Sequence, residues 1–103
     1  MKPNLIKTPL KNGSVLVELE GLGGESDFYS VFERMNEVIK PDFSRDSVDS
    51  LCVMGTFRKD GISVRMSSEG INEWVSFQYD AAALSDEDNA KVTGWLEALA
   101  AAL

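Results

Sequence analysis

The side chains that most often carry out acid–base and nucleophilic chemistry are scarce in this sequence. It contains no histidine and a single cysteine, Cys52. Histidine is the commonest general base. Because the chain has none, a Ser-His or Cys-His nucleophile pair is impossible within one chain. A single cysteine excludes an internal disulfide, and a zinc site built from cysteine and histidine lacks its ligands. The chemistry that remains would use Asp or Glu together with Arg.

Cys52 is predicted to lie on a central strand, where a free cysteine is usually a small packed hydrophobe. A reactive thiol needs a basic neighbour that lowers its pKa, and only Arg58 and Arg65 would approach this one. We therefore expect no nucleophilic role for Cys52.

A glycine-rich segment, Gly21-Leu22-Gly23-Gly24, lies between a predicted strand and a predicted helix, as phosphate-binding loops do. It departs from the G-x-G-x-x-G pattern at Ser26, and the neighbouring Glu20, Glu25 and Asp27 would repel a phosphate. We interpret the segment as a turn between strand and helix.

Acidic residues that could hold a hard cation occur at Asp42, Asp46 and Asp49. They lack the glycine and the terminal glutamate of an EF-hand loop, and a solvated loop explains them. Asp86-Glu87-Asp88 is explained by the start of a helix, where carboxylates are favourable. The sequence therefore predicts no catalytic residue, no cofactor and no metal.

Length and composition are those of an ordinary globular protein. The 103 residues predict one domain, 1–103. No apolar run approaches the roughly 20 residues of a membrane helix, and the N-terminus lacks the apolar stretch of a signal peptide. We expect a cytoplasmic protein that makes no contact with a membrane.

The net charge is −7, and residues 66–103 contribute most of it, with seven acids and only Lys91. Binding nucleic acid through its phosphates needs a basic footprint, which the sequence does not indicate. A basic protein partner would be steered toward the acidic end. We expect this acidic region to combine the first turn of the last helix with Glu69, Glu73 and Asp80.

The first half of the chain predicts a hairpin and a helix. A two-residue turn at Asn12-Gly13 would pair Leu10 with Val15, Thr8 with Val17 and Ile6 with Leu19, with Pro9 in an edge strand. Apolar residues at helical spacing, capped by Ser26 and stopped at Lys40-Pro41, then predict a helix that buries Phe28, Val31, Phe32, Met35, Val38 and Ile39. Residues 41–50 are expected to form a polar connection.

The second half predicts a three-stranded meander and a closing helix. A turn at Asp60-Gly61 pairs Phe57 with Val64 and Gly55 with Met66. A four-residue loop then pairs Met66 with Val75, Val64 with Phe77 and Ile62 with Tyr79.

Ser85 is the expected N-cap of the closing helix, whose apolar stripe contains Val92, Trp95, Leu96, Leu99 and Leu103. Gly94 is expected to permit close packing against a strand or the other helix. The order β-β-α-β-β-β-α predicts an α+β fold, an antiparallel sheet of about five strands with both helices on one face.

The opposite face of this sheet would be open. By the same register it carries Cys52, Met54, Thr56, Arg58, Ser63, Arg65, Ser67, Trp74, Ser76 and Gln78. Most are small or polar, as on a solvated face. Trp74, beside Ser67, is the exception, and tryptophan and arginine are enriched in interface hot spots. Packing of Trp74 over Met54 or a loop is the alternative.

The leading hypothesis is a non-enzymatic protein-binding domain, for example an immunity protein, antitoxin or inhibitor of a basic partner. Its binding residues would be Trp74, Met54, Arg58, Arg65, Gln78, Glu69, Glu73, Asp86, Glu87 and Asp88. One alternative is a pocket between sheet and helices that binds a small ligand or catalyses a reaction with Asp, Glu and Arg. Another is a homodimer joined through the open sheet face.

Overall fold

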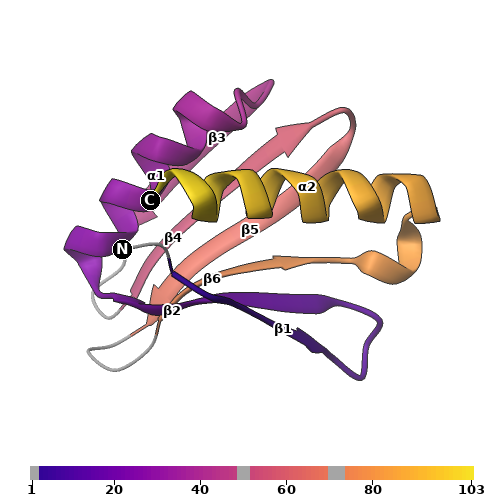
Figure 1. Ribbon diagram of the computed structural model, residues 1–103, viewed down its shortest axis with the longest axis horizontal. Helices are drawn as coiled ribbons and strands as arrows, with labels where there is room; N and C mark the ends of the chain where they lie inside the picture. Colours follow the sequence, from indigo (N-terminus) through magenta and orange to yellow (C-terminus); the bar gives the residue numbers. More distant parts are fainter. Residues whose placement is uncertain (1–2, 49–51, 70–73) are drawn as a thin grey trace.

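The computed structural model describes residues 3–48, 52–69 and 74–103. Within these ranges the chain forms one sheet, two α-helices and a short 3-10 helix (Figure 1). In chain order the elements are β1 (Leu5–Pro9), β2 (Val15–Gly23), α1 (Glu25–Val38), β3 (Phe43–Val48), β4 (Cys52–Lys59), β5 (Ile62–Glu69), β6 (Trp74–Tyr79), η1 (Ala81–Ala83) and α2 (Asp86–Ala102).

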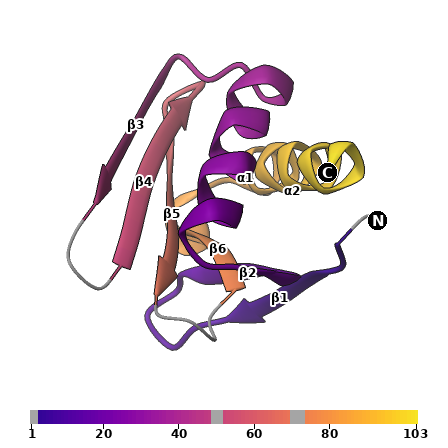
Figure 2. The ribbon, with the colours of Figure 1, turned by 90° about the vertical axis from the view of Figure 1, so that its left-hand side faces the viewer.

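The six strands lie in the order β1-β2-β6-β5-β4-β3, and every neighbouring pair is antiparallel. Figure 2 shows the sheet curving around α1 and α2, which both lie on its inner side. The α+β prediction, with two helices on one face, is confirmed, although the sheet has one strand more than expected. No helix among the described residues is long and apolar enough to cross a membrane.

The core lies between the inner face of the sheet and the two helices. Its strand residues alternate with outward-facing ones, because successive side chains of a strand point to opposite faces. The largest fully buried side chains are Leu19, Phe28, Val31, Met35, Phe57, Val64, Met66, Val75, Phe77, Val92, Leu96 and Leu99. The faces predicted for β2, β4, β5 and β6 are therefore confirmed.

The prediction that residues 41–50 form a polar connection is wrong, since Phe43–Val48 is the edge strand β3. Its sequence, FSRDSV, has no apolar alternation. An edge strand with one face in water can do without such a pattern because backbone bonds to β4 hold it. Its charged pair, Arg45-Asp46, also suits an exposed edge, where charges oppose pairing with another chain.

The register predicted for the first hairpin is wrong by one residue. Val17 pairs with Lys7, and Leu19 pairs with Leu5. The loop has three residues rather than two: Leu10 N–H donates to Ser14 O at 2.8 Å, and Gly13 N–H donates to Leu10 O at 3.2 Å. This arrangement is a tight turn followed by a glycine at positive φ. A shift of one residue exchanges faces, so Lys7 rather than Thr8 is on the inner side of β1.

The register predicted between β5 and β6 is wrong by two residues. Met66 pairs with Phe77, not Val75, and Ser67 pairs with Ser76, with their hydroxyl oxygens 3.2 Å apart. Trp74 therefore does not lie beside Ser67, and its neighbour in β2 is Gly23. A shift of two residues leaves every side chain on the predicted face.

The start of α1 differs from the predicted cap. Gly24, at φ 89°, occupies the N-cap position, and Ser26 lies inside the first turn. The Ser68 hydroxyl accepts from Gly24 N–H at 2.9 Å, and the Asp27 carboxylate accepts from Gly23 N–H at 2.9 Å. The turn is thus held by β5 and by the helix itself.

Two glycines have opposite surroundings. A Cβ at Gly55 would lie 3.1 Å from the Phe28 ring and 3.3 Å from the Phe32 ring, so this glycine lets α1 approach β4 closely. A Cβ at Gly94 would meet nothing within 4 Å, and the expected close packing at Gly94 is therefore wrong. Ser85 is the N-cap of α2 as predicted, and its hydroxyl accepts from Asp88 N–H at 3.1 Å.

Candidate functional site

The sheet face that carries no helix, here called the outer face, holds the exposed large apolar side chains of the described residues. These are Phe43, Met54 and Trp74, with 47%, 39% and 36% of their surface exposed. Phe43 pairs with Arg58, and Met54 pairs with Ser47, so their side chains share the outward direction. The three are spread across the face, because Phe43 lies on β3 at one end of the sheet and Trp74 starts β6 at the other. The face therefore resembles an interface in its composition and not as one contiguous apolar patch.

Three of the four arginines of the chain are on the same face. Arg45 and Arg65 both pair with Thr56, one from each side, so a single cross-strand row runs through all three residues. Gln78 continues this row beyond Arg65. The two arginines are separated by two strand spacings, about 10 Å. Two cations at this distance can bind separate carboxylates of one partner.

Arg58 is held against an aromatic ring. Its guanidinium carbon lies 5.7 Å from the ring centroid of Phe43, within the range of a cation–π contact. The surface beside it is slightly hollowed: a depression of about 180 Å³ is bordered by Arg45, Met54 and Arg65. A second, of about 130 Å³, reaches Gln78. The outer face therefore offers one apolar recess bordered by Arg45 and Arg65, and a more polar one beside it.

The structure places the residues predicted for the open face on one side of the sheet. Met54, Arg58, Arg65, Trp74 and Gln78 all lie on it, from β4, β5 and β6. Sequence reasoning missed Phe43 and Arg45, because it treated their segment as a connection. The signal available was an aromatic and an arginine two positions apart, the spacing that puts both on one face of a strand.

The predicted acidic region is divided. Asp80 follows the end of β6, and Asp86, Glu87 and Asp88 form the first turn of α2, where Asp88 lies 3.8 Å from Lys91. Glu69 ends β5 beside the start of β6. The length of β6, about 20 Å, therefore separates Glu69 from Asp80 and from the first turn of α2. Glu73 lies outside the described residues. The structure therefore places Glu69 and the first turn of α2 at opposite ends of β6.

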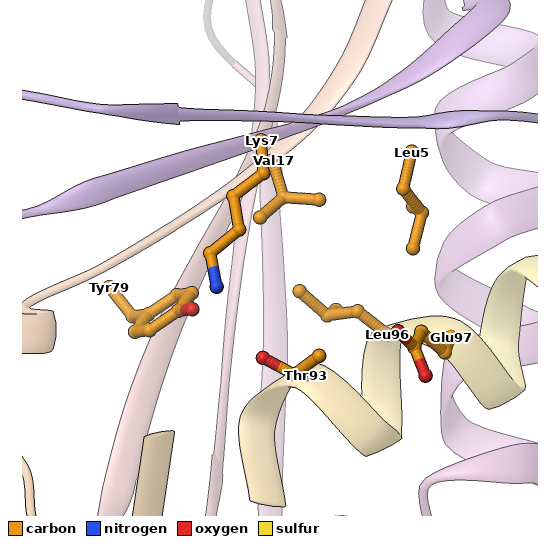
Figure 3. Close-up of a pocket in the computed structure, with 7 residues that line it drawn as sticks. All are labelled: Leu5, Lys7, Val17, Tyr79, Thr93, Leu96 and Glu97. Carbon is orange, nitrogen blue, oxygen red and sulfur yellow. The ribbon is translucent and has the colours of Figure 1, made fainter. Parts of the chain in front are cut away.

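A pocket of about 170 Å³, here called the β1–α2 pocket, opens between the edge strand and the last helix (Figure 3). Its lining residues come from β1, β2, β6 and α2: Leu5, Lys7, Val17, Tyr79, Thr93, Leu96 and Glu97. A pocket between sheet and helix was expected for a ligand-binding domain, but its ionisable groups are Lys7, Tyr79 and Glu97 rather than an arginine. Lys7 lines it because of the register of β1.

Among the described residues, the glycine-rich turn and Asp42 are engaged in hydrogen bonds within the fold. Two N–H groups of the glycine-rich turn already donate to Ser68 and Asp27, so they are not directed at an anion. The Asp42 carboxylate accepts from Asp60 N–H at 3.1 Å. No group of three metal-ligating side chains occurs within the described ranges, and Asp49 and the Cys52 side chain lie outside what the structure describes.

Tyr29 of α1 is perturbed electrostatically but lies apart from both surfaces. Burial raises the pKa of its phenol above the ordinary value of 10.0, and the carboxylates of Asp46 and Glu25 raise it further. Its ring meets that of Phe28 edge-on, with 5.7 Å between centroids. Tyr29 therefore remains a neutral packing residue at physiological pH.

No protein-family model, curated protein or solved structure matches the chain.

Proposed function

We propose that this protein is a non-enzymatic, cytoplasmic domain that binds another protein through its outer face. The observation that carries the proposal is the composition of that face, where Phe43, Met54 and Trp74 are exposed on the same side of the sheet as three arginines. Aromatic residues, methionine and arginine are the side chains enriched in the centres of protein interfaces. An inhibitor, immunity protein or antitoxin would use such a face to cover its target.

Charge defines the partner more closely. The outer face is locally cationic through Arg45, Arg58 and Arg65, so it favours a contact patch with carboxylates and apolar side chains. The chain as a whole has a net charge of −7, which sets the field felt at a distance. The partner we propose is therefore basic overall and presents a small acidic and apolar patch to the outer face.

The same charge argues against a nucleic acid as the occupant. Exposed aromatics and arginines on a sheet are also used to stack and neutralise single strands. A polyanion, however, would approach against the net charge of −7, whereas a basic protein would be attracted. We therefore propose a protein partner, and crosslinks to RNA are the contrary outcome of the photo-crosslinking experiment below.

Photo-crosslinking in the source cell tests the proposal. A photoreactive amino acid replaces Thr56, at the centre of the outer face, and in a matched variant it replaces Ala98, exposed on α2. We expect one protein to be crosslinked from position 56 and not from position 98, at an acidic patch. Equal crosslinking from both positions, or crosslinks to RNA, would contradict the proposal.

Affinity measurements with the purified partner then test the chemistry. Arg45→Glu and Arg65→Glu should each weaken binding by at least about tenfold, since each leaves a partner carboxylate facing a like charge. Lys11→Glu, in the β1–β2 loop, makes the same change of charge away from the face and should leave the dissociation rate unaltered. The association rate should fall as salt is added. Sedimentation that shows two copies joined through the outer face would replace the proposal with a homodimer.

A further inference from the structure

We propose that the β1–α2 pocket binds a small carboxylic acid with an apolar body, holding its carboxylate between Lys7 and Tyr79. The pocket lies on the helix side of the sheet, so this inference is independent of the outer face. Either proposal can fail without affecting the other.

The Tyr79 hydroxyl is the feature that points to a ligand. Tyr79 is only 3% exposed, and its hydroxyl makes no hydrogen bond to any described residue. Figure 3 shows this oxygen directed toward the other residues of the pocket. A buried hydroxyl without a partner destabilises a fold, because it has lost its bonds to water. A ligand atom that accepts its proton would remove that cost.

Lys7 supplies the charge. Because it pairs with Val17, its side chain leaves β1 on the inner side, and in Figure 3 its ammonium group extends into the pocket. Within the described part of the chain, no carboxylate lies within ion-pair distance of this group. Thr93 adds a hydroxyl from α2. An ammonium and two hydroxyl donors together match the oxygens of a carboxylate.

The Lys7 side chain is one part of the pocket that can move. The Tyr79 hydroxyl is screened from solvent, and Figure 3 shows the Lys7 chain passing beside it. Lys7 is exposed, and an exposed side chain changes rotamer within nanoseconds. A ligand would therefore reach Tyr79 by displacing the Lys7 chain and would then keep its ammonium as a partner.

The walls and the volume define the rest of the ligand. Leu5, Val17 and Leu96 give the pocket an apolar lining. Its volume of about 170 Å³ is close to that of an apolar protein cavity of about 150 Å³ that binds benzene. The apolar body is therefore about the size of one six-membered ring. Glu97, on the same rim, would repel a second anionic group, so a monocarboxylate is favoured over a dicarboxylate.

Benzoate is a probe of the right size and charge, and NMR titration of the full chain is the test. We expect saturable shifts at the amides of Lys7, Tyr79 and Thr93, with a dissociation constant on the order of 1 mM for so small a ligand. Benzamide, which has the same ring without the charge, should bind at least about tenfold more weakly. Equal binding of the two compounds, or no saturable shift with benzoate, would overturn the proposal.

Variants separate a ligand site from ordinary packing. Tyr79→Phe should weaken benzoate binding by about tenfold and at the same time raise the Tm of the ligand-free protein, since it removes the unpartnered hydroxyl. Lys7→Met should weaken binding by a similar factor, whereas Lys11→Met, the matched loop control, should not. A Tyr79→Phe protein with a lower Tm and unchanged benzoate affinity would show that the hydroxyl has a structural partner and would overturn the assignment.

Discussion

Lys59 of β4 donates from its ammonium group to the carbonyl oxygen of Ile39, the C-cap residue of α1. The last turn of α1 contains no basic residue of its own. A cation from the sheet therefore compensates the negative end of the helix dipole. The same ammonium lies 6.0 Å from the ring centroid of Trp95, so one side chain contacts both helices.

Replacing Lys59 should therefore destabilise the fold more than its partial exposure suggests. We expect Lys59→Met to lower the free energy of unfolding by about 1–2 kcal/mol, because the carbonyl groups at the end of α1 lose their cation. Urea denaturation measures the change. Lys11→Met removes the same charge from a loop and should cost less than about 0.5 kcal/mol. Equal effects of the two variants would mean that the contact contributes nothing.

The two tryptophans should respond differently to truncation. Trp95 packs against Phe57 with their ring centroids 6.4 Å apart, and we expect Trp95→Ala to cost about 2–3 kcal/mol, somewhat below the value for a fully buried tryptophan. Trp74→Ala, on the outer face, should lower the free energy of unfolding by less than about 1 kcal/mol. Thermal denaturation of both variants provides the comparison. If Trp74→Ala lowered the Tm as much as Trp95→Ala, Trp74 would be a packing residue and not an interface residue.

Substitutions at Gly55 and Gly94 should change the free energy of unfolding in opposite directions. Gly55→Val would force atoms against the rings of Phe28 and Phe32, at an expected cost of about 1–3 kcal/mol. Gly94→Ala fills open space on a helix and should stabilise the protein by about 0.5–1 kcal/mol through helix propensity. Chemical denaturation measures both. A destabilising Gly94→Ala would indicate that another surface packs against this side of α2.

Ionisation of Tyr29 should lower the stability of the protein at alkaline pH. Its folded pKa is raised above 10.0 by burial and by the carboxylates of Asp46 and Glu25. The contribution of the neutral phenol to stability is therefore complete below pH 10.0 and is lost as the pH rises through the folded pKa. Unfolding of wild type and Tyr29→Phe should be compared on both sides of pH 10.0. The variant should lose less stability over this interval, and parallel losses would contradict the assignment.

Much of the fold follows from hydrophobic alternation, and its errors have a common physical origin. The pattern decides which face a residue occupies, as at Val64 and Phe77, but a slip of two residues preserves both faces. The register of β6 could therefore not be found from the pattern. The register of β1 depends on whether Asn12-Gly13 closes a loop of two residues or three, and both loops use this dipeptide.

Those errors also limited what could be said of the sites. The outer-face residues of β4, β5 and β6 were predictable, because an even shift keeps Trp74 and Arg65 on the outside. The β1–α2 pocket was not predictable. The extra residue in the β1–β2 loop is what places Lys7 on the same face of the sheet as Tyr79. Phe43 and Arg45 were not predicted for the outer face, because a polar edge strand resembles a loop in composition.

The place of β6 in the sheet bears on how this chain is made by the ribosome. β6 lies between β2 and β5, yet it is the last strand to be synthesised. Until it emerges, the N-terminal hairpin and the β3–β5 meander are two separate nascent sheets, each with an unpaired inner edge. Exposed edges of this kind are templates for pairing with other chains. The chain is thus most vulnerable to aggregation in the interval before β6 has joined the two sheets.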